Sequence, residues 1–238
     1  MTGTNGAARV TVLDEARSAT RAKLQQALDT AHADRSLPTA PALSAVLPGG
    51  ALRAGSSYSV QGSTALAMLM MAGPSDHGAW CGAVGLPAFG AEAAAGLGVA
   101  LDRLVLVPSP GQEWLGVVAT LLDVLTVVVV QPPREVTAAE ASRLSARMRD
   151  RGAVLVAIGS WPGSAARLQA GEQLWSGLGE GFGHLTAREI TVTVTGRRTA
   201  TRPRQHRLWL PDATGTVRSA ERAPVVESVP AWQREAVG

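Results

Sequence analysis

Residues 126–158 have the sequence TVVVVQPPREVTAAEASRLSARMRDRGAVLVAI. The opening run of β-branched residues, Thr126 to Val130, predicts a central strand that is covered on both faces. Thr137 and Glu140 have the spacing of a capping box, which predicts the start of a helix. Ala153 to Ile158 predicts a second buried strand. The stretch is therefore a strand–helix–strand unit, which decides the fold class as α/β.

Further strands and helices alternate on the amino-terminal side of this unit. Such alternation predicts a mostly parallel α/β sheet that is flanked by helices. On the carboxyl-terminal side, two segments alternate apolar and polar residues, which predicts an antiparallel extension of the sheet. The expected strands are 57–61, 80–86, 104–107, 190–195 and 207–210, and the expected helices are 65–72, 91–95 and 112–123.

The distribution of proline and charge divides the chain into three parts. Residues 1–36 are expected to form an N-terminal arm that carries a helix over 14–35. Residues 37–212 are expected to form the core domain, and residues 213–238 a polar tail. Residues 36–48 contain three prolines, so we interpret them as a linker into the core.

Glycine recurs at every second position from Gly177 to Gly183. A dinucleotide-binding fingerprint would follow a strand and open a helix, and this run does neither. We therefore expect a flexible loop here.

The composition is that of a globular protein, with 46% hydrophobic and 17% charged residues. Lys23 is the only lysine among 22 basic residues, so the sequence pI near 9.9 reflects arginine and does not by itself indicate a nucleic-acid surface. The single cysteine, Cys81, lies in an apolar run and is expected to be a buried thiol. The N-terminus lacks the apolar core of a signal peptide, and the strongest apolar run, Val124 to Val130, is too short to cross a bilayer. We expect a cytoplasmic protein that makes no membrane contact.

Gly62, Ser63 and Thr64 end a strand and open a helix, which is where a phosphate-binding loop would lie. Such a loop needs a first glycine, a lysine for the β- and γ-phosphates, and Ser or Thr for magnesium. Here the position five residues before Gly62 is Ser57, and no lysine follows. The turn is also too short for the full loop. We predict a structural turn and a chain that does not hydrolyse ATP.

The metal side of nucleotide chemistry is missing as well. A carboxylate that holds magnesium is expected at the end of a central strand, and Gln131 occupies that position. The first acid after it is Glu135. The four histidines are scattered without metal-ligand spacing, so the sequence predicts no metal site, no catalytic residues and no cofactor.

Arginine and tryptophan gather in the carboxyl-terminal third, where both residue types suit binding hot spots. We expect partner-binding residues here, and also on a narrow apolar stripe in the N-terminal helix. A solvated hairpin loop and a surface that contacts nucleic acid stay open as alternatives. The candidate residues are Arg197, Arg198, Arg202, Arg204, Trp209 and Trp232, with Leu24 and Leu28 on the helix; Trp161 and Trp175 lie in the same third.

The order of these elements resembles the RecA-like ATPase core. Ser57 to Ala72 stands where RecA-like proteins place the phosphate loop and its helix, and Gly96 to Leu104 (GLGVALDRL) is similar to their run into the next strand. Thr126 to Gln131 occupies the position of the magnesium-carboxylate strand.

A narrower resemblance lies in the segment before the first core strand. Residues 41–52 (PALSAVLPGGAL), followed by Tyr58 to Gly62 (YSVQG), are similar to the RecA-like accessory protein of the mutasome operon, in its actinobacterial ImuA-prime type. The resemblance covers about residues 40 to 212. It carries over no catalytic residue, because the matching positions lack the ATPase motifs.

This resemblance implies a non-catalytic adaptor in damage-induced translesion synthesis. The implied partners are an inactive Y-family polymerase-like subunit and, as further candidates, an error-prone C-family polymerase or RecA. Direct contact with DNA stays open. SulA-type cell-division inhibitors share a RecA-like core without ATPase parts, so binding of the tubulin-like division protein is the alternative function.

Overall fold

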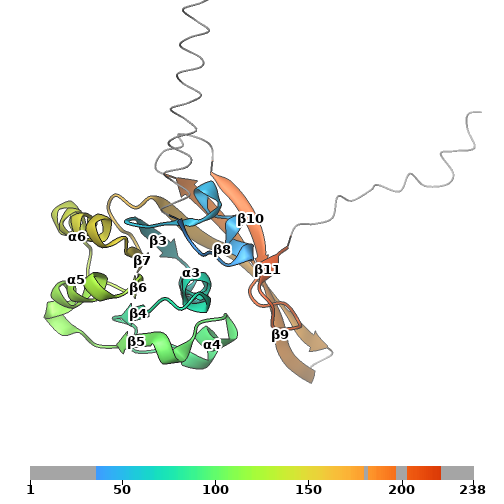
Figure 1. Ribbon diagram of the computed structural model, residues 1–238. Coiled ribbons are helices and arrows are strands. Elements are labelled where there is room, and N and C mark those ends of the chain that lie inside the picture. The colour runs from blue at the N-terminus through green and yellow to red at the C-terminus, as the bar shows by residue number, and fades with distance from the viewer. Residues whose placement is uncertain (1–35, 180–181, 197–202, 221–238) are drawn as a thin grey trace, which may run out of the picture.

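The computed structural model of the 238-residue chain describes residues 36–179, 182–196 and 203–220. They form a nine-stranded sheet with the order β11-β10-β9-β8-β3-β7-β6-β4-β5, beside a two-stranded ladder of β1 and β2 (Figure 1). Neighbouring strands from β3 to β5 in this order pair in parallel, and those from β8 to β11 pair antiparallel. The predicted α/β class with a C-terminal antiparallel extension is confirmed.

The parallel half of the sheet has a layer of helices on each face. Helices α3 and α4 share one buried apolar cluster with β3, and helices α5 and α6 share the other (Figure 1). Side chains that are adjacent in a strand enter opposite clusters, because they point to opposite faces. The parallel strands are β3 (Ser57–Gln61), β4 (Cys81–Val84), β5 (Leu104–Val107), β6 (Val127–Val130) and β7 (Val154–Ile158), and the helices are α3 (Thr64–Asp76), α4 (Ala91–Gly96), α5 (Trp114–Val124) and α6 (Ala138–Arg151), with 3-10 turns η1 (Pro48–Gly50), η2 (Leu101–Arg103) and η3 (Gly111–Glu113).

Helix α6 has the start that its sequence predicts. The Thr137 side chain accepts from the Glu140 N–H, and the Glu140 carboxylate accepts from the Thr137 N–H at 2.9 Å. Arg134 pairs with the same carboxylate at 2.6 Å. The helix ends at Gly152, whose φ of 70° is left-handed and suits glycine.

The antiparallel extension is longer than its sequence suggests. It consists of β8 (Ala166–Gly179), β9 (Phe182–Gly196), β10 (Arg204–Trp209) and β11 (Arg218–Ser219). The flexible loop expected around Gly177 is therefore wrong, because Gly177 and Gly179 lie in β8 and Gly183 lies in β9. Gly177 has a φ of 113°, and a Cβ there would clash with the His184 carbonyl oxygen. Glycine here permits a close approach of the two strands at an irregular point of the ladder.

The interpretation of residues 36–48 as a linker is also wrong, since this segment packs into the core. Strand β1 (Ser36–Leu37) pairs with β2 (Leu52–Arg53), and α2 (Pro41–Ser44) follows β1. Leu43 and Leu47 are buried in the cluster that α3 shares. A Cβ on Gly73 of α3 would lie 2.7 Å from the Pro38 carbonyl oxygen, so the segment lies directly against that helix. The prolines shape a tightly packed turn.

The sheet also continues beyond residue 212, where the polar tail was expected to begin. Strand β11 pairs with the end of β10, and Val217 packs against the core. Cys81 is fully buried, as predicted, and burial raises the pKa of its thiol to about 12. Within the described ranges no helix is long and apolar enough to cross a membrane.

Candidate functional site

The turn between β3 and α3 is a compact helix cap. Ser63 is the N-cap of α3, and its hydroxyl accepts a hydrogen bond from the Leu66 N–H at 3.2 Å. Only Gly62 and Ser63 separate the strand from the helix. A phosphate loop would instead present several free N–H groups around a wider cradle. The turn has the geometry of a structural cap.

Strand β8 lies over this turn. A Cβ on Gly62 would lie 2.6 Å from the carbonyl oxygen of Ala170 in β8. The Gln173 amide donates a long hydrogen bond of 3.5 Å to the Gly62 carbonyl. Backbone and side chains of the extension therefore occupy the space beside Gly62, the carboxyl end of β3.

Gln131 follows β6 beside an opening of about 820 Å³. This opening is also lined by Gly85, Gln112 and Trp114, at the carboxyl ends of β4, β5 and β6. Ligands of open α/β sheets bind at this end, where neighbouring connections leave on opposite faces. The described residues that line this opening include no carboxylate.

A cation site would need acidic ligands, which magnesium prefers. Among the described residues no group of three or more His, Cys, Asp or Glu side chains gathers in a metal-binding arrangement. Arg134, at the rim of the opening, is already paired with Glu140 and lies 5.9 Å from the Trp114 ring. The opening offers prolines, amides and an aromatic ring rather than groups for phosphate chemistry.

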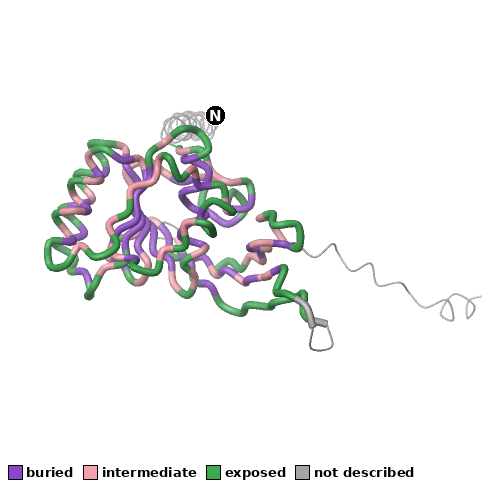
Figure 2. The backbone as a smooth tube through the Cα atoms, turned by 90° about the horizontal axis from the view of Figure 1, so that it is seen from below, coloured by how far each residue is buried: buried purple, intermediate pink, exposed green. Residues whose placement is uncertain are grey.

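A different surface stands out on the extension. The outer parts of β8 and β9, residues 171–178 and 184–186, are all exposed, and we call them the arm. Figure 1 shows this hairpin running out past the helices, and Figure 2 colours it as exposed. Large apolar side chains of the arm are nevertheless in solvent: Leu174, Trp175 (52% exposed), Leu178 (65% exposed) and Leu185.

Trp175 is held in place at the base of the arm. It lies opposite Arg188 in the ladder, and the guanidinium lies 5.1 Å from the centre of the indole ring. The Arg188 Nε donates to the Leu210 carbonyl at 2.9 Å, which fixes the guanidinium. Partial burial lowers the pKa of Arg188. The exposed indole is thus pre-oriented, which reduces the entropy lost when it binds.

One face of the extension adds a second surface. Alternate side chains of β9, Ile190, Val192 and Val194, enter the core, so the side chains between them point to the other face. None of the described residues on this other face belongs to a buried cluster. We call it the open face; its residues by register are Arg167, Gln169, Leu174, Glu189, Thr191, Thr193, Thr195, Gln205, Arg207, Trp209 and Arg218.

Trp209 belongs to a cross-strand row on the open face. Glu189 lies opposite Leu174 on one side and opposite Trp209 on the other. Arg218 pairs with Trp209 in the ladder, with its guanidinium 5.8 Å from the ring centre, and also forms a 2.6 Å ion pair with Asp212. The row therefore combines an aromatic ring with charges that are already held in place.

The candidate residues of the sequence have three outcomes. Trp209 and Arg204 lie in β10, Trp209 on the open face and Arg204 exposed at the first position of the strand. Trp161, by contrast, is buried in the apolar cluster that α5 and α6 share and is no surface residue. The remaining candidates lie outside the described residues: Leu24, Leu28, Arg197, Arg198, Arg202 and Trp232.

Apart from Trp175, the exposed apolar side chains of the arm were not expected from the sequence. The pattern that could have indicated them is the presence of apolar residues on both sides of the glycine run, with LWSGLG at 174–179 and GFGHL at 181–185. Apolar residues on both sides of a glycine-rich centre indicate a hairpin.

Comparisons with known proteins support the fold and a family. The model of a family described as MT3502 N-terminal domain matches residues 45–163. The uncharacterized protein Rv3395c of Mycobacterium tuberculosis is 36% identical over 113 residues, which are 47% of this chain and 55% of that protein. The chain thus matches about half the length of this curated relative. The crystal structure of the RadB recombinase matches with a TM-score of 0.54 at 16% identity, over 76% of this chain and 97% of that one. This likeness supports a RecA-like fold.

Proposed function

The chain belongs to the MT3502 N-terminal domain family, and we propose that it acts without catalysis, as an adaptor that binds other proteins of a damage-induced translesion-synthesis mutasome. The observation that carries this proposal is the position of the exposed apolar side chains. Of the eight large apolar side chains that the described residues expose, four lie in the arm. The arm belongs to the extension and lies apart from the opening beside Gln131.

The absence of catalysis rests on the turn at Gly62. Ser63 caps the helix, β8 lies against the turn, and Lys23 is the only lysine of the chain. Each charge-assisted contact that a lysine or a magnesium carboxylate would make contributes about 1.5–3 kcal/mol. We propose that without them the protein neither hydrolyses ATP nor binds it tightly.

Calorimetric titration of the full chain with magnesium-ATP tests this part. We expect no heat of binding at micromolar concentrations and no phosphate release over hours. Micromolar affinity for magnesium-ATP, or measurable phosphate release, would contradict this part of the proposal.

The arm and the open face provide the contacts of an adaptor. Trp and Arg are enriched at interface hot spots, and Trp175 with Arg188 is such a pair in a pre-oriented form. Strand β11 pairs with Leu208 and Trp209, and the Ala220 N–H donates to the Arg207 carbonyl, so this edge of β10 has no described partner strand at Arg204 and Gln205. An extended tail of a partner can add a strand at such an edge.

The resemblance of residues 41–52 and 58–62 to the mutasome accessory protein selects the partner. We propose the inactive Y-family polymerase-like subunit as the direct partner, with the error-prone C-family polymerase or RecA joined through it. Such a role places the protein in the cytoplasm.

Trp175 and Trp80, which are 52% and 49% exposed, permit a matched test. Trp175→Ala with Leu185→Ala alters the arm, whereas Trp80→Ala with Leu106→Ala alters exposed residues at the far edge of the sheet. Affinity purification of the full chain from DNA-damaged cells, followed by titration with the purified subunit at physiological salt, measures binding. We expect the arm variant to lose about 2 kcal/mol or more and the control to bind as the wild type.

Equal binding by both variants would move the interface away from the arm. Recovery of the tubulin-like division protein in place of polymerase subunits would instead favour the alternative, a SulA-like inhibitor of cell division.

A further inference from the structure

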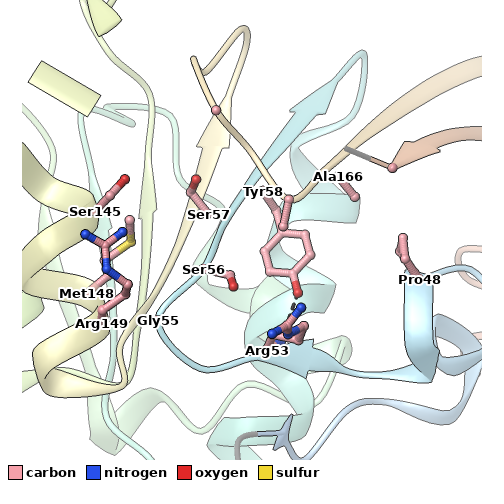
Figure 3. A pocket seen from close by; sticks show the side chains of 13 residues that line it. Pro48, Arg53, Gly55, Ser56, Ser57, Tyr58, Ser145, Met148, Arg149 and Ala166 are labelled. Carbon is pink, nitrogen blue, oxygen red and sulfur yellow. Dashed lines mark hydrogen bonds between the residues drawn. The ribbon is translucent and has the colours of Figure 1, made fainter. Parts of the chain in front are cut away.

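A cavity of about 270 Å³ lies at the amino end of β3, at the opposite end of that strand from Gly62 (Figure 3). It is bounded by the turn between β2 and β3, by the last turns of α6 and by the residues that lead into β8. The polar groups that line it include Arg53, Ser56, Ser57, Tyr58 and Arg149. None of the described residues that line it is acidic.

Two donors in this cavity lack acceptors. The Nε of Arg53 is buried and has no hydrogen-bond partner in the part of the chain that the structure describes. The Tyr58 hydroxyl accepts from the Arg53 backbone N–H at 2.9 Å, which leaves its own proton to donate, and no described residue accepts it. Figure 3 shows the Arg53 side chain beside this hydroxyl. A buried donor without a partner costs free energy, so a ligand that brings an acceptor to this side of the cavity would be stabilised.

Tyr58 is a well-fixed donor. Its side chain is buried, with the residue only 2% exposed, and burial raises the pKa of the phenol. The phenol therefore keeps its proton across the physiological range. Ser57, which is also buried, and Ser56 add hydroxyl groups to the same wall.

The charge of the cavity is unbalanced. Neither Arg53 nor Arg149 forms an ion pair with any described residue, whereas six other described arginines do: Arg103, Arg134, Arg147, Arg151, Arg207 and Arg218. Figure 3 shows Arg149 apart from Arg53, near Ser145. Arg149 therefore contributes positive potential to one side of the cavity, while Arg53 and Tyr58 supply directed hydrogen bonds on the other.

We infer that this cavity binds an oxyanion, the phosphate or carboxylate group of a small molecule, with Arg53 and Tyr58 as its direct donors. Guanidinium groups match both kinds of group in geometry and charge. The volume lies just below the range of about 300–1,000 Å³ that is typical of sites for drug-sized ligands, so the ligand is small. The site lies at the other end of β3 from the expected nucleotide position, and it is independent of the proposed adaptor function.

The test is a titration of the isotope-labelled full chain with inorganic phosphate and, separately, with acetate, followed by amide NMR at constant ionic strength in chloride. We expect saturable shifts at Arg53, Tyr58 and their neighbours with at least one of the two anions, and the tighter one identifies the class. Arg53→Gln is expected to weaken this binding about tenfold, because it removes a charge-assisted donor. Arg149→Gln is expected to weaken it several-fold.

Arg143→Gln is the matched control, since Arg143 is exposed on the same helix and does not line the cavity. It should leave the affinity unchanged. If Arg53→Gln fails to fold, Tyr58→Phe together with Arg149→Gln carries the same test. Shifts that do not saturate with either anion, or equal affinity in the cavity variants and the control, would overturn the inference. Loss of this binding would leave partner capture by the arm unaffected, so the two proposals fail separately.

Discussion

The four valines of β6 are all buried, whereas in β9 burial alternates. In β6, Val127 and Val129 enter one apolar cluster, and Val128 and Val130 enter the other. In β9, Ile190, Val192 and Val194 are buried while the threonines between them belong to no cluster. The two strands belong to one sheet, but helices cover both faces of the first and only one face of the second is packed.

This difference suggests that the parallel half of the sheet mainly stabilises the fold and that the antiparallel extension is available for binding. A strand covered on both faces stabilises the fold and has no surface left for a partner. A strand covered on one face keeps a surface, and where β8 and β9 run beyond the core they expose apolar side chains as well. The extension is therefore the part of the molecule in which substitutions are expected to change binding more than stability.

The largest expected effect compares two tryptophans. Trp161 is 1% exposed in the apolar cluster that α5 and α6 share, so Trp161→Ala is expected to lower the free energy of unfolding by about 3–5 kcal/mol. Trp175→Ala in the arm is expected to cost less than about 1 kcal/mol, mainly the stacking with Arg188. Urea unfolding of both variants measures the difference. Similar losses would mean that the arm unfolds with the core and contributes to its stability.

Gly177→Ala tests whether the arm can be perturbed without a change in the core of the sheet. A Cβ would meet the His184 carbonyl, and the φ of 113° is strained for alanine. A local cost of about 1–3 kcal/mol is expected, with faster amide hydrogen exchange in residues 171–186 and unchanged exchange in β6.

Gly116→Ala in α5 is the control for this glycine. The nearest contact of its new Cβ lies 3.9 Å away, so it should leave stability unchanged or raise it slightly. Unaltered exchange in the arm of Gly177→Ala would show that the close approach of β8 and β9 is not a constraint.

Thr137→Ala tests the N-cap of α6, a helix that covers the parallel half of the sheet. Loss of the N-cap of α6 is expected to cost about 1 kcal/mol, because the Glu140 N–H loses its acceptor. Thr120 lies within α5 and donates to the Gly116 carbonyl, so Thr120→Ala is expected to change stability by less than about 0.5 kcal/mol. Thermal unfolding compares them, and an equal shift for both would contradict a capping role.

The smallest effect concerns pH. The Arg134 guanidinium and then the Thr137 groups lower the pKa of Glu140 from 4.5 to about 2. A lowered pKa contributes stability above the unfolded value, and this contribution is lost as pH falls from about 4.5 to about 2. The stability difference between wild type and Glu140→Gln should therefore shrink across that range.

Asp212 provides the counterpart in the extension. Hydrogen bonds from Arg218, Thr214 and Thr216 hold the pKa of its carboxyl well below the usual value. The difference between wild type and Asp212→Asn is expected to shrink below about pH 4 in the same sense. A difference that stays constant with pH in either pair would show that the ion pair does not contribute to folding.

Much of the parallel half could be predicted from local sequence. The β-branched run at 126–130 and the capping box at Thr137 and Glu140 each specify an element within a few residues, because periodicity and caps are local properties. The α/β class followed from their order. The hairpin around Gly177 could not be seen in this way, because its outer residues are exposed on both faces and therefore show no alternation.

The sequence by itself determined the main strands and helices of the parallel half, and it shows that no lysine stands in the turn after β3. Only the tertiary structure decided that β8 lies over the turn at Gly62, that residues 36–48 pack against α3, and that Arg53 meets Tyr58 in a cavity without an acid. The first two depend on residues far apart in the chain, and the cavity beside Arg53 and Tyr58 is completed by Arg149 of α6. Their contacts follow from the register of the sheet and the path of its connections, and neither leaves a periodic signal in the amino-acid sequence.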